Sequence, residues 1–302
     1  MLIEKQDFLK APEVSDFSSW LSEISDKLIV NLKVKKSRFV KGGIEAECIG
    51  FHEILKNYCW ESSWTDPFSK RKYQSKDWTQ TRDSIKVLSE LLLQSIECGD
   101  NFKTFRVCEQ ILIWGGNRDV NKGATPQLKC LKSQNELLRY LEQAKNTFDG
   151  DTISTDQIKR DVKFSGSMWT KIYALNSVSG APIYDTRVAA AICTLVALFR
   201  YTNKSQPRKR SLLDFSVSTQ EKKRKLFTLP DNNVVRFHFL KNNSASWTEN
   251  TLKLSWIIDL VISKKPELFM DENNIRMKKH AFEACLFMLG YNTENLEISA
   301  NF

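Results

Sequence analysis

Two ionisable residues stand near the starts of two expected helices. Lys171 closes the stretch Phe164-Ser165-Gly166-Ser167-Met168-Trp169-Thr170-Lys171, in the first turns of a helix expected to begin near Met168. Asp185 follows the turn Ser179-Gly180-Ala181-Pro182 and precedes an alanine-rich apolar helix. A neutral amine can attack an electrophilic carbon, and a carboxylate at a helix N-terminus can orient the attacking group and stabilise developing positive charge. The pair predicts an active site.

Each of these residues also has an ordinary structural interpretation. A lysine beside Trp169 and Tyr173 is usually a surface residue whose stem packs on apolar neighbours. Asp185 has the place of a helix N-cap. Arg187 is either a surface arginine or a clamp for phosphate. The chemical interpretation requires partial burial of Lys171 and a nearby cation such as Arg187, because both lower the pKa of an amine.

The order of these parts resembles the helix-hairpin-helix DNA glycosylases, especially the oxoguanine-glycosylase-like bacterial branch. A divergent branch, the bacterial phage-defence glycosylases that remove modified cytosines, is a further candidate. The resemblance implies that Lys171 forms a Schiff base with the sugar in bifunctional members and that Asp185 is essential. It also implies that the hairpin residues Ser165, Gly166 and Ser167 hold the DNA backbone.

Supporting segments extend the resemblance loosely from residue 50 to residue 291. These are Ile111-Leu112-Ile113-Trp114-Gly115-Gly116, followed by an asparagine-bearing loop, and Leu286-Phe287-Met288-Leu289-Gly290-Tyr291. The chain departs from the family in its hairpin, which is not Leu-Pro-Gly-Val-Gly. It departs also in the short interval of 14 positions between Lys171 and Asp185.

Aromatic side chains are expected around a base that leaves the duplex. Flipping a nucleotide costs a few kcal/mol, and stacking in a pocket offsets part of that cost. The predicted base pocket consists of Trp114, Trp169 and Tyr184, although most tryptophans belong to the core. Trp114 stands at a helix end before two glycines, and Trp169 comes shortly before the lysine.

The basic residues suit a polyanionic partner. Lys and Arg outnumber Asp and Glu by 45 to 36, which gives a net charge of +9. Residues 203–225 contain eight basic and two acidic residues and thus carry +6 of this charge. The segment is either a solvated linker or a DNA-binding arm in which Lys209 and Arg210 contact phosphate.

Hydrophobic periodicity predicts a mostly α, two-lobed helical bundle with minor β structure near the N-terminus. Helices are expected over 14–30, 51–60, 81–98, 102–114, 131–145, 250–262 and 277–289. A short hairpin is expected within 29–50, where residues 34–40 alternate between apolar and polar. Residues 61–79 are expected to form an aromatic loop. The expected division is an N-terminal extension (1–50), a glycosylase-like core (51–203), a basic linker (204–235) and a C-terminal helical segment (236–302).

Composition narrows the classes of function. Seven scattered cysteines without a CxxC pair, and only three histidines, argue against a metal centre. The apolar settings of Cys193 and Cys285 predict buried, reduced thiols. These features predict a cytoplasmic protein without a cofactor, and the resemblance to glycosylases implies that double-stranded DNA is its partner. We expect it to be a monomer. Two alternatives are a noncatalytic DNA-binding or lesion-sensing protein on the same scaffold and a helical protein-interaction module whose aromatic loop docks a partner.

Overall fold

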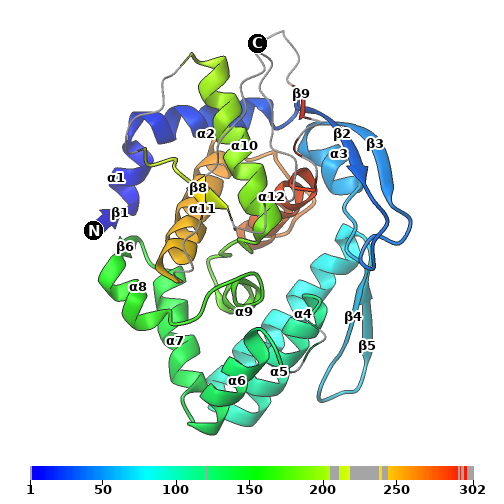
Figure 1. Ribbon diagram of the computed structural model, residues 1–302, viewed down its shortest axis with the longest axis vertical. Helices are drawn as coiled ribbons and strands as arrows, with labels where there is room; N and C mark the ends of the chain where they lie inside the picture. The colour runs from blue at the N-terminus through cyan, green and yellow to red at the C-terminus, as the bar shows by residue number, and fades with distance from the viewer. Residues whose placement is uncertain are drawn as a thin grey trace.

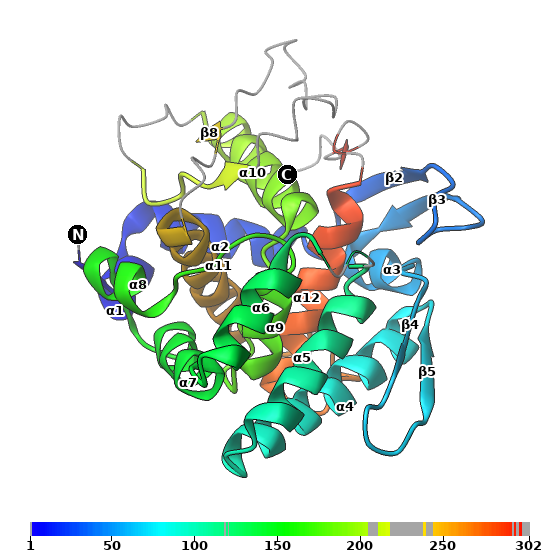
Figure 2. The same cartoon turned by 60° about the horizontal axis from the view of Figure 1, so that its bottom comes forward.

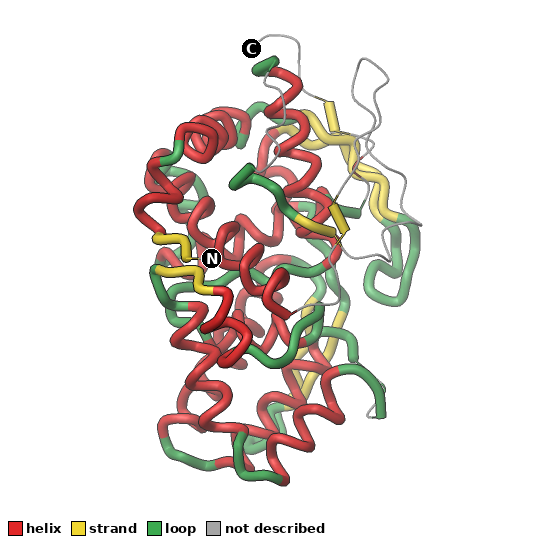
Figure 3. The backbone as a smooth tube through the Cα atoms, turned by 60° about the vertical axis from the view of Figure 1, so that its left-hand side comes forward, coloured by secondary structure: helices red, strands yellow, loops and turns green. Residues whose placement is uncertain are grey.

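The computed structural model describes residues 2–117, 119, 121–204, 211–217, 238–239, 244–291, 293 and 296–297. This part of the chain contains twelve α-helices and nine short strands. Helices dominate the backbone trace, and the strands lie at its periphery (Figure 3). The predicted mostly α class is therefore confirmed.

The helices gather in two groups (Figure 1). One group is formed by helices from both ends of the chain: α1 (Lys5–Lys10), α2 (Pro12–Ile24), α3 (Gly50–Lys56), α10 (Thr186–Thr202), α11 (Ser244–Lys264) and α12 (Ile275–Leu289). The other group comes from the middle of the chain: α4 (Trp78–Glu97), α5 (Asn101–Trp114), α6 (Ala124–Ser133) and α7 (Leu137–Phe148). Within the first group α2 packs on α11 and α10 packs on α12, so N-terminal and C-terminal segments share one core.

Two short helices connect these groups: α8 (Thr155–Asp161) and α9 (Trp169–Asn176). Helix α8 contacts α7 and α11, whereas α9 packs against α4, α5 and α7. The chain then crosses from the C-terminus of α9 to the start of α10 in the first group. Lys171 on α9 and Asp185 before α10 thus lie at the junction of the two groups.

The helix boundaries follow from caps and burial. Side-chain oxygens of Asp77, Asp100 and Asn274 accept hydrogen bonds from backbone N–H groups in the first turns of α4, α5 and α12, each at 2.9 Å. Such caps satisfy donors that have no partner within the helix. Helices α10 and α11 are buried around most of their circumference because both are central. Cys193 and Cys285 are buried, as predicted.

The strands form small peripheral sheets. Strand β2 (Ile29–Val34) pairs with both β3 (Ile44–Ile49) and β9 (Leu296–Glu297) in a three-stranded sheet. Two further antiparallel pairs are β4 (Ser62–Thr65) with β5 (Lys72–Ser75), and β1 (Leu2–Glu4) with β6 (Thr152–Ser154). Strand β7 (Ser216–Val217) pairs in parallel with β8 (His238–Phe239). Two of these pairs, β2–β3 and β4–β5, are hairpins that lie on the same side of the molecule (Figures 1 and 2).

Three local predictions were wrong. The alternating segment 34–40 is mostly the loop after β2, closed by a bridge between Ser37 and Val40. The aromatic segment 61–79 is not a loop: it forms β4 and β5, whose Trp64 and Tyr73 rings stack with centroids 4.3 Å apart. The expected helix 131–145 is interrupted between α6 and α7, where Asn135 takes a positive φ of 55°.

Most of the predicted linker 204–235 lies outside the described residues, so the proposed domain boundaries remain predictions. Among its described residues, the segment 211–217 is hydrogen-bonded to the N-terminal region. Glu13 accepts hydrogen bonds from Ser211 Oγ at 2.7 Å and from the Leu212 N–H at 2.8 Å. In the described ranges, none of the helices combines the length and apolar character required to cross a membrane.

Candidate active site

A seven-residue turn, 162–168, joins α8 to α9 at the place of the predicted hairpin, whose likeness to the glycosylase element stays a prediction. Its first half is held by two tyrosines, one on α7 and one on α9. Tyr140 Oη accepts from the Phe164 N–H at 3.2 Å, and Tyr173 Oη donates to the Phe164 carbonyl at 2.8 Å. The Phe164 ring also stacks on Trp169, with centroids 5.0 Å apart. These contacts give the turn a defined position relative to α9.

The tip of the turn is open. Gly166 has a φ of +112°, and a β-carbon there would meet nothing within 4 Å. Among the described hydrogen bonds, none is donated by the backbone N–H groups of Ser165, Gly166 or Ser167. Three consecutive donors in a glycine turn before a helix suit an anion. The structure therefore leaves these residues available for the predicted contact with DNA backbone.

Lys171 is buried rather than exposed, with 7% of its surface accessible. Its ammonium donates to the Ser167 carbonyl at 2.8 Å. Burial lowers the pKa of Lys171, and the positive charge of Arg187 acts in the same direction. The negative charge of Asp185 opposes this shift, as does that of Glu283 when it is ionised. The surface-lysine interpretation therefore does not fit, and the amine is shifted towards its neutral, nucleophilic form.

Gly115, at the C-terminus of α5, makes room for the lysine. A β-carbon at position 115 would stand 2.9 Å from Lys171 Cε and still nearer to Cδ. The aliphatic part of the Lys171 side chain therefore packs directly against the Cα of Gly115. This role was not predicted, because the sequence indicates the Gly115-Gly116 pair only as the end of a helix.

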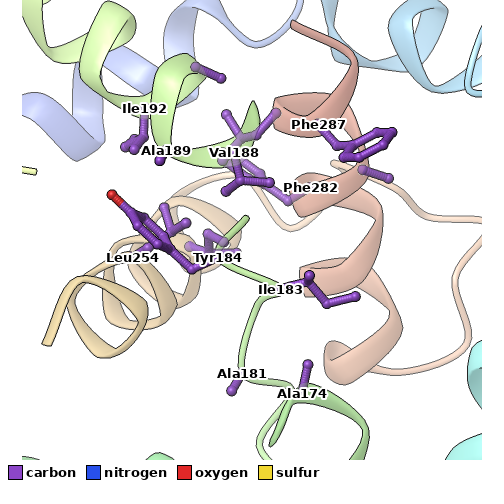
Figure 4. Close-up of a cluster of buried hydrophobic side chains, with 14 of the residues drawn as sticks. Ala174, Ala181, Ile183, Tyr184, Val188, Ala189, Ile192, Leu254, Phe282 and Phe287 are labelled. Atoms are coloured by element: carbon purple, nitrogen blue, oxygen red, sulfur yellow. The ribbon is translucent and has the colours of Figure 1, made fainter. Parts of the chain in front are cut away.

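Asp185 is the N-cap of α10, as the sequence predicted. Its Oδ1 accepts from the N–H groups of Arg187 at 2.8 Å and Val188 at 3.0 Å, and its Oδ2 lies 3.8 Å from Arg187 Nη1. The two preceding residues are buried in the core: Ile183 points towards α12 and Tyr184 towards α11 (Figure 4). Asp185 is 4% exposed, and this cap holds it at the end of a helix dipole.

Arg187 is surrounded by aromatic rings. Its Cζ lies 4.2 Å from the centroid of Tyr291, 4.8 Å from Phe287 and 5.5 Å from Trp60. Among the described residues, its buried Nε has no hydrogen-bond partner. The guanidinium thus stands beside Asp185 among aromatic rings, with 20% of the side chain exposed, and cation–π attraction adds to its ion pair with Asp185.

Glu283 on α12 is the ionisable group that sequence reasoning missed. Burial raises its pKa well above the usual value, and the charge of Asp185 adds to this, whereas Lys171 and the Ile183 N–H oppose it. His280 Nδ1 lies 3.7 Å from Glu283 Oε2, and burial lowers the pKa of His280 to about 3, so this imidazole is neutral. The only sequence signal was a charged residue inside an apolar helical pattern.

The predicted base-pocket residues are packed against protein in this structure. Trp114 is buried, and its carbonyl accepts from Trp60 Nε1 at 3.2 Å. Trp169 Nε1 donates to Gln127 Oε1 at 2.5 Å. Tyr184 is fully buried, and its hydroxyl donates to the Ser216 carbonyl at 2.9 Å. Trp114 precedes Gly115, which lies against the Lys171 stem, and Trp169 follows Met168, whose carbonyl accepts from the Lys171 N–H at 3.2 Å.

Two of the predicted DNA contacts, Lys209 and Arg210, lie outside the described residues. Within the described part of the chain, no group of three or more His, Cys, Asp or Glu residues could hold a metal ion. No family model, curated protein or solved structure matches the chain. The case for a function therefore rests on the residues of the site.

Proposed function

We propose that the protein is a DNA glycosylase of the helix-hairpin-helix type that flips out and excises a damaged or modified base. The observation that carries this proposal is the buried Lys171 with a lowered pKa, placed after a glycine hairpin and electrostatically coupled to the helix-capping Asp185. Amines and carboxylates in this arrangement suit attack on a sugar carbon.

The reaction would proceed at the anomeric carbon of the flipped nucleotide. The glycosidic bond breaks and its electron pair leaves with the base, while Asp185 stabilises the positive charge that develops on the sugar. In one branch, neutral Lys171 forms a bond to this carbon and loses a proton, which the departing base takes up. The sugar ring then opens, its oxygen takes the second amine proton, and the resulting imine leads to strand cleavage. In the other branch, a water oriented by Asp185 attacks and loses one proton to the departing base, which leaves an intact abasic site.

Substrate access requires movement of side chains. Lys171 and Asp185 are only 7% and 4% exposed. The site lies where two groups of helices meet, so a change in the packing of these groups is the movement that would expose both residues. Stacking of the flipped base on aromatic side chains would offset part of the cost of opening.

The test is release of a base from defined DNA. A panel of duplexes with oxidised, alkylated, deaminated and glycosylated bases is incubated with the protein, and free base is measured. Borohydride added during the reaction should trap a covalent complex with the wild-type protein and none with Lys171→Gln. Base release without trapping supports the water branch, and absence of release from every duplex contradicts the proposal.

A noncatalytic DNA-binding protein on the same scaffold is the second candidate. It is favoured by the two hydrogen bonds through which Asp185 caps α10, because these alone explain an aspartate at this position. Asp185→Asn separates the two candidates, since asparagine keeps the capping oxygen but removes the charge. Lost base release with retained DNA binding supports the glycosylase; unchanged release removes Asp185 from the mechanism.

A further inference from the structure

A polar hollow of about 350 Å³ lies between the loop after β2 and the β4–β5 hairpin. Its lining includes three basic residues, Arg38, Lys41 and Lys76, together with the polar side chains of Ser63 and Gln74. The two hairpins that form it lie next to each other at one side of the molecule (Figure 2). This basic hollow was not predicted from the sequence.

The charge of the basic hollow is only partly compensated. Lys41 Nζ lies 2.9 Å from Glu61 Oε2, and the Lys41 N–H donates to Oε1 at 3.0 Å. Among the described residues, no carboxylate lies within 4.0 Å of the cationic groups of Arg38 or Lys76. The three basic side chains and the single carboxylate of Glu61 together give this concave, exposed hollow a net charge of +2. A hollow with this charge attracts a small anion.

A continuous chain of contacts links the basic hollow to the candidate active site. Arg38 Nη2 donates to the Gly116 carbonyl at 2.9 Å, and its guanidinium covers the Phe39 ring at 4.3 Å. Phe39 stacks on Trp60 with centroids 3.8 Å apart. Trp60 in turn belongs to the aromatic group around Arg187. The hollow thus adjoins the site instead of standing apart from it.

We propose that the basic hollow binds a backbone phosphate of the DNA strand whose nucleotide enters the site of Lys171 and Asp185. This inference rests on the proposed function. Arg38 and Lys76 neutralise the phosphate, and the hydroxyl of Ser63 and the amide of Gln74 supply further hydrogen bonds. Guanidinium groups match phosphate geometry, and an arginine already braced by Gly116 loses little freedom on binding. The hairpin 162–168 then holds a second position on the backbone.

The experiment measures binding of a duplex as a function of salt. All proteins carry Asp185→Asn to prevent turnover, and the duplex contains a stable abasic-site analogue. The double variant Arg38→Gln/Lys76→Gln is compared with the control Lys10→Gln/Lys145→Gln, which removes equal charge from α1 and α7, away from the two hairpins (Figure 1). Lys76→Gln alone is included because it leaves the bond from Arg38 to Gly116 intact.

We expect Arg38→Gln/Lys76→Gln to bind at least ~10-fold more weakly at low salt. The slope of log K against log salt should become shallower by about 0.9 for each phosphate that the variant no longer neutralises. The control should keep the slope of the Asp185→Asn parent, and Lys76→Gln should fall between the control and the double variant. Base release is measured separately, with the protein that retains Asp185. Equal slopes for the double variant and the control overturn the inference, even if the protein with Asp185 releases base. A shallower slope, together with no base release by the protein with Asp185, supports phosphate binding in the hollow and overturns the glycosylase. Failure of the parent protein to bind duplex contradicts both.

Discussion

The side chain of Lys171 lies directly across the α-carbon of Gly115. A β-carbon at position 115 would stand 2.9 Å from Lys171 Cε and nearer still to Cδ, a separation that real β-carbons essentially never show. Gly115 itself has an ordinary helical φ of −68°, so glycine is required for space and not for backbone conformation. The end of α5 therefore shapes the channel in which the lysine stem runs.

Gly115→Ala should displace Lys171 while the fold persists, because the methyl group meets a flexible side chain. A displacement of the amine by ~1 Å can lower a rate by about 100-fold. We expect this loss in borohydride trapping and in base release. The unfolding free energy of Gly115→Ala, measured by urea denaturation, should show a cost that disappears in the background Lys171→Ala. If Gly115→Ala lowers the unfolding free energy equally with Lys171 and with Lys171→Ala, the strain does not come from the contact with the Lys171 side chain.

Asp185→Ala and Asp185→Asn should differ in stability but not in activity. Alanine removes both hydrogen bonds of the cap, which costs about 1 kcal/mol, whereas asparagine retains an acceptor. Both substitutions remove the carboxylate charge and should abolish base release. Thermal unfolding and released base are measured for each. If Asp185→Asn retains full activity, the charge has no part in catalysis.

The lowered pKa of Lys171 should appear in the pH dependence of trapping. The neutral amine becomes populated at lower pH than for an ordinary lysine, because burial penalises the ammonium form. The trapping rate should therefore rise with pH and reach its plateau below the usual lysine pKa of about 10.4. Single-turnover trapping over a series of buffers gives the profile. A rate that still rises in proportion to hydroxide above that value would show an unshifted amine.

Glu283→Gln should make stability less dependent on pH. The pKa of Glu283 is raised in the folded state, so the native protein retains a proton that the unfolded chain releases. Stability from this group is present below the unfolded pKa near 4.3 and is lost as pH rises through the folded value, by at most about 1.4 kcal/mol per pH unit. Urea unfolding between pH 5 and 8 should show a steeper decline for the wild type than for the variant; parallel curves contradict the assignment.

Gly290→Ala should destabilise the fold itself. Position 290 ends α12, and a β-carbon there would overlap the backbone carbonyl of Arg187 and stand 2.7 Å from its Cα. Backbone cannot yield as a side chain does, so α10 and α12 must separate, at a cost of about 1–3 kcal/mol or more. Gly42→Ala is the control, because its β-carbon meets nothing within 4 Å. Equal melting temperatures for the two variants would contradict this close approach.

Sequence patterns predicted those features that are encoded over a few residues. The cap at Asp185, the helix that carries Lys171 and the stop at Gly115 depend on local hydrogen bonds and on periodicity, and all three are present. The sequence predictions were wrong where contacts between residues far apart in the chain decide the local structure. The segment 61–79 becomes a hairpin because Trp64 stacks on Tyr73, and two polar, aromatic strands of four residues show too little alternation to reveal this.

The sequence by itself determined the mostly helical class and the order of hairpin, lysine, turn and aspartate. Only the tertiary structure decided the surroundings of Lys171. Gly115 comes from α5, Glu283 from α12 and Asp185 from the start of α10, so their proximity to the amine depends on how the two groups of helices meet. The shift of its pKa follows from burial and from charges on these separate elements, and neither quantity exists before the chain has folded.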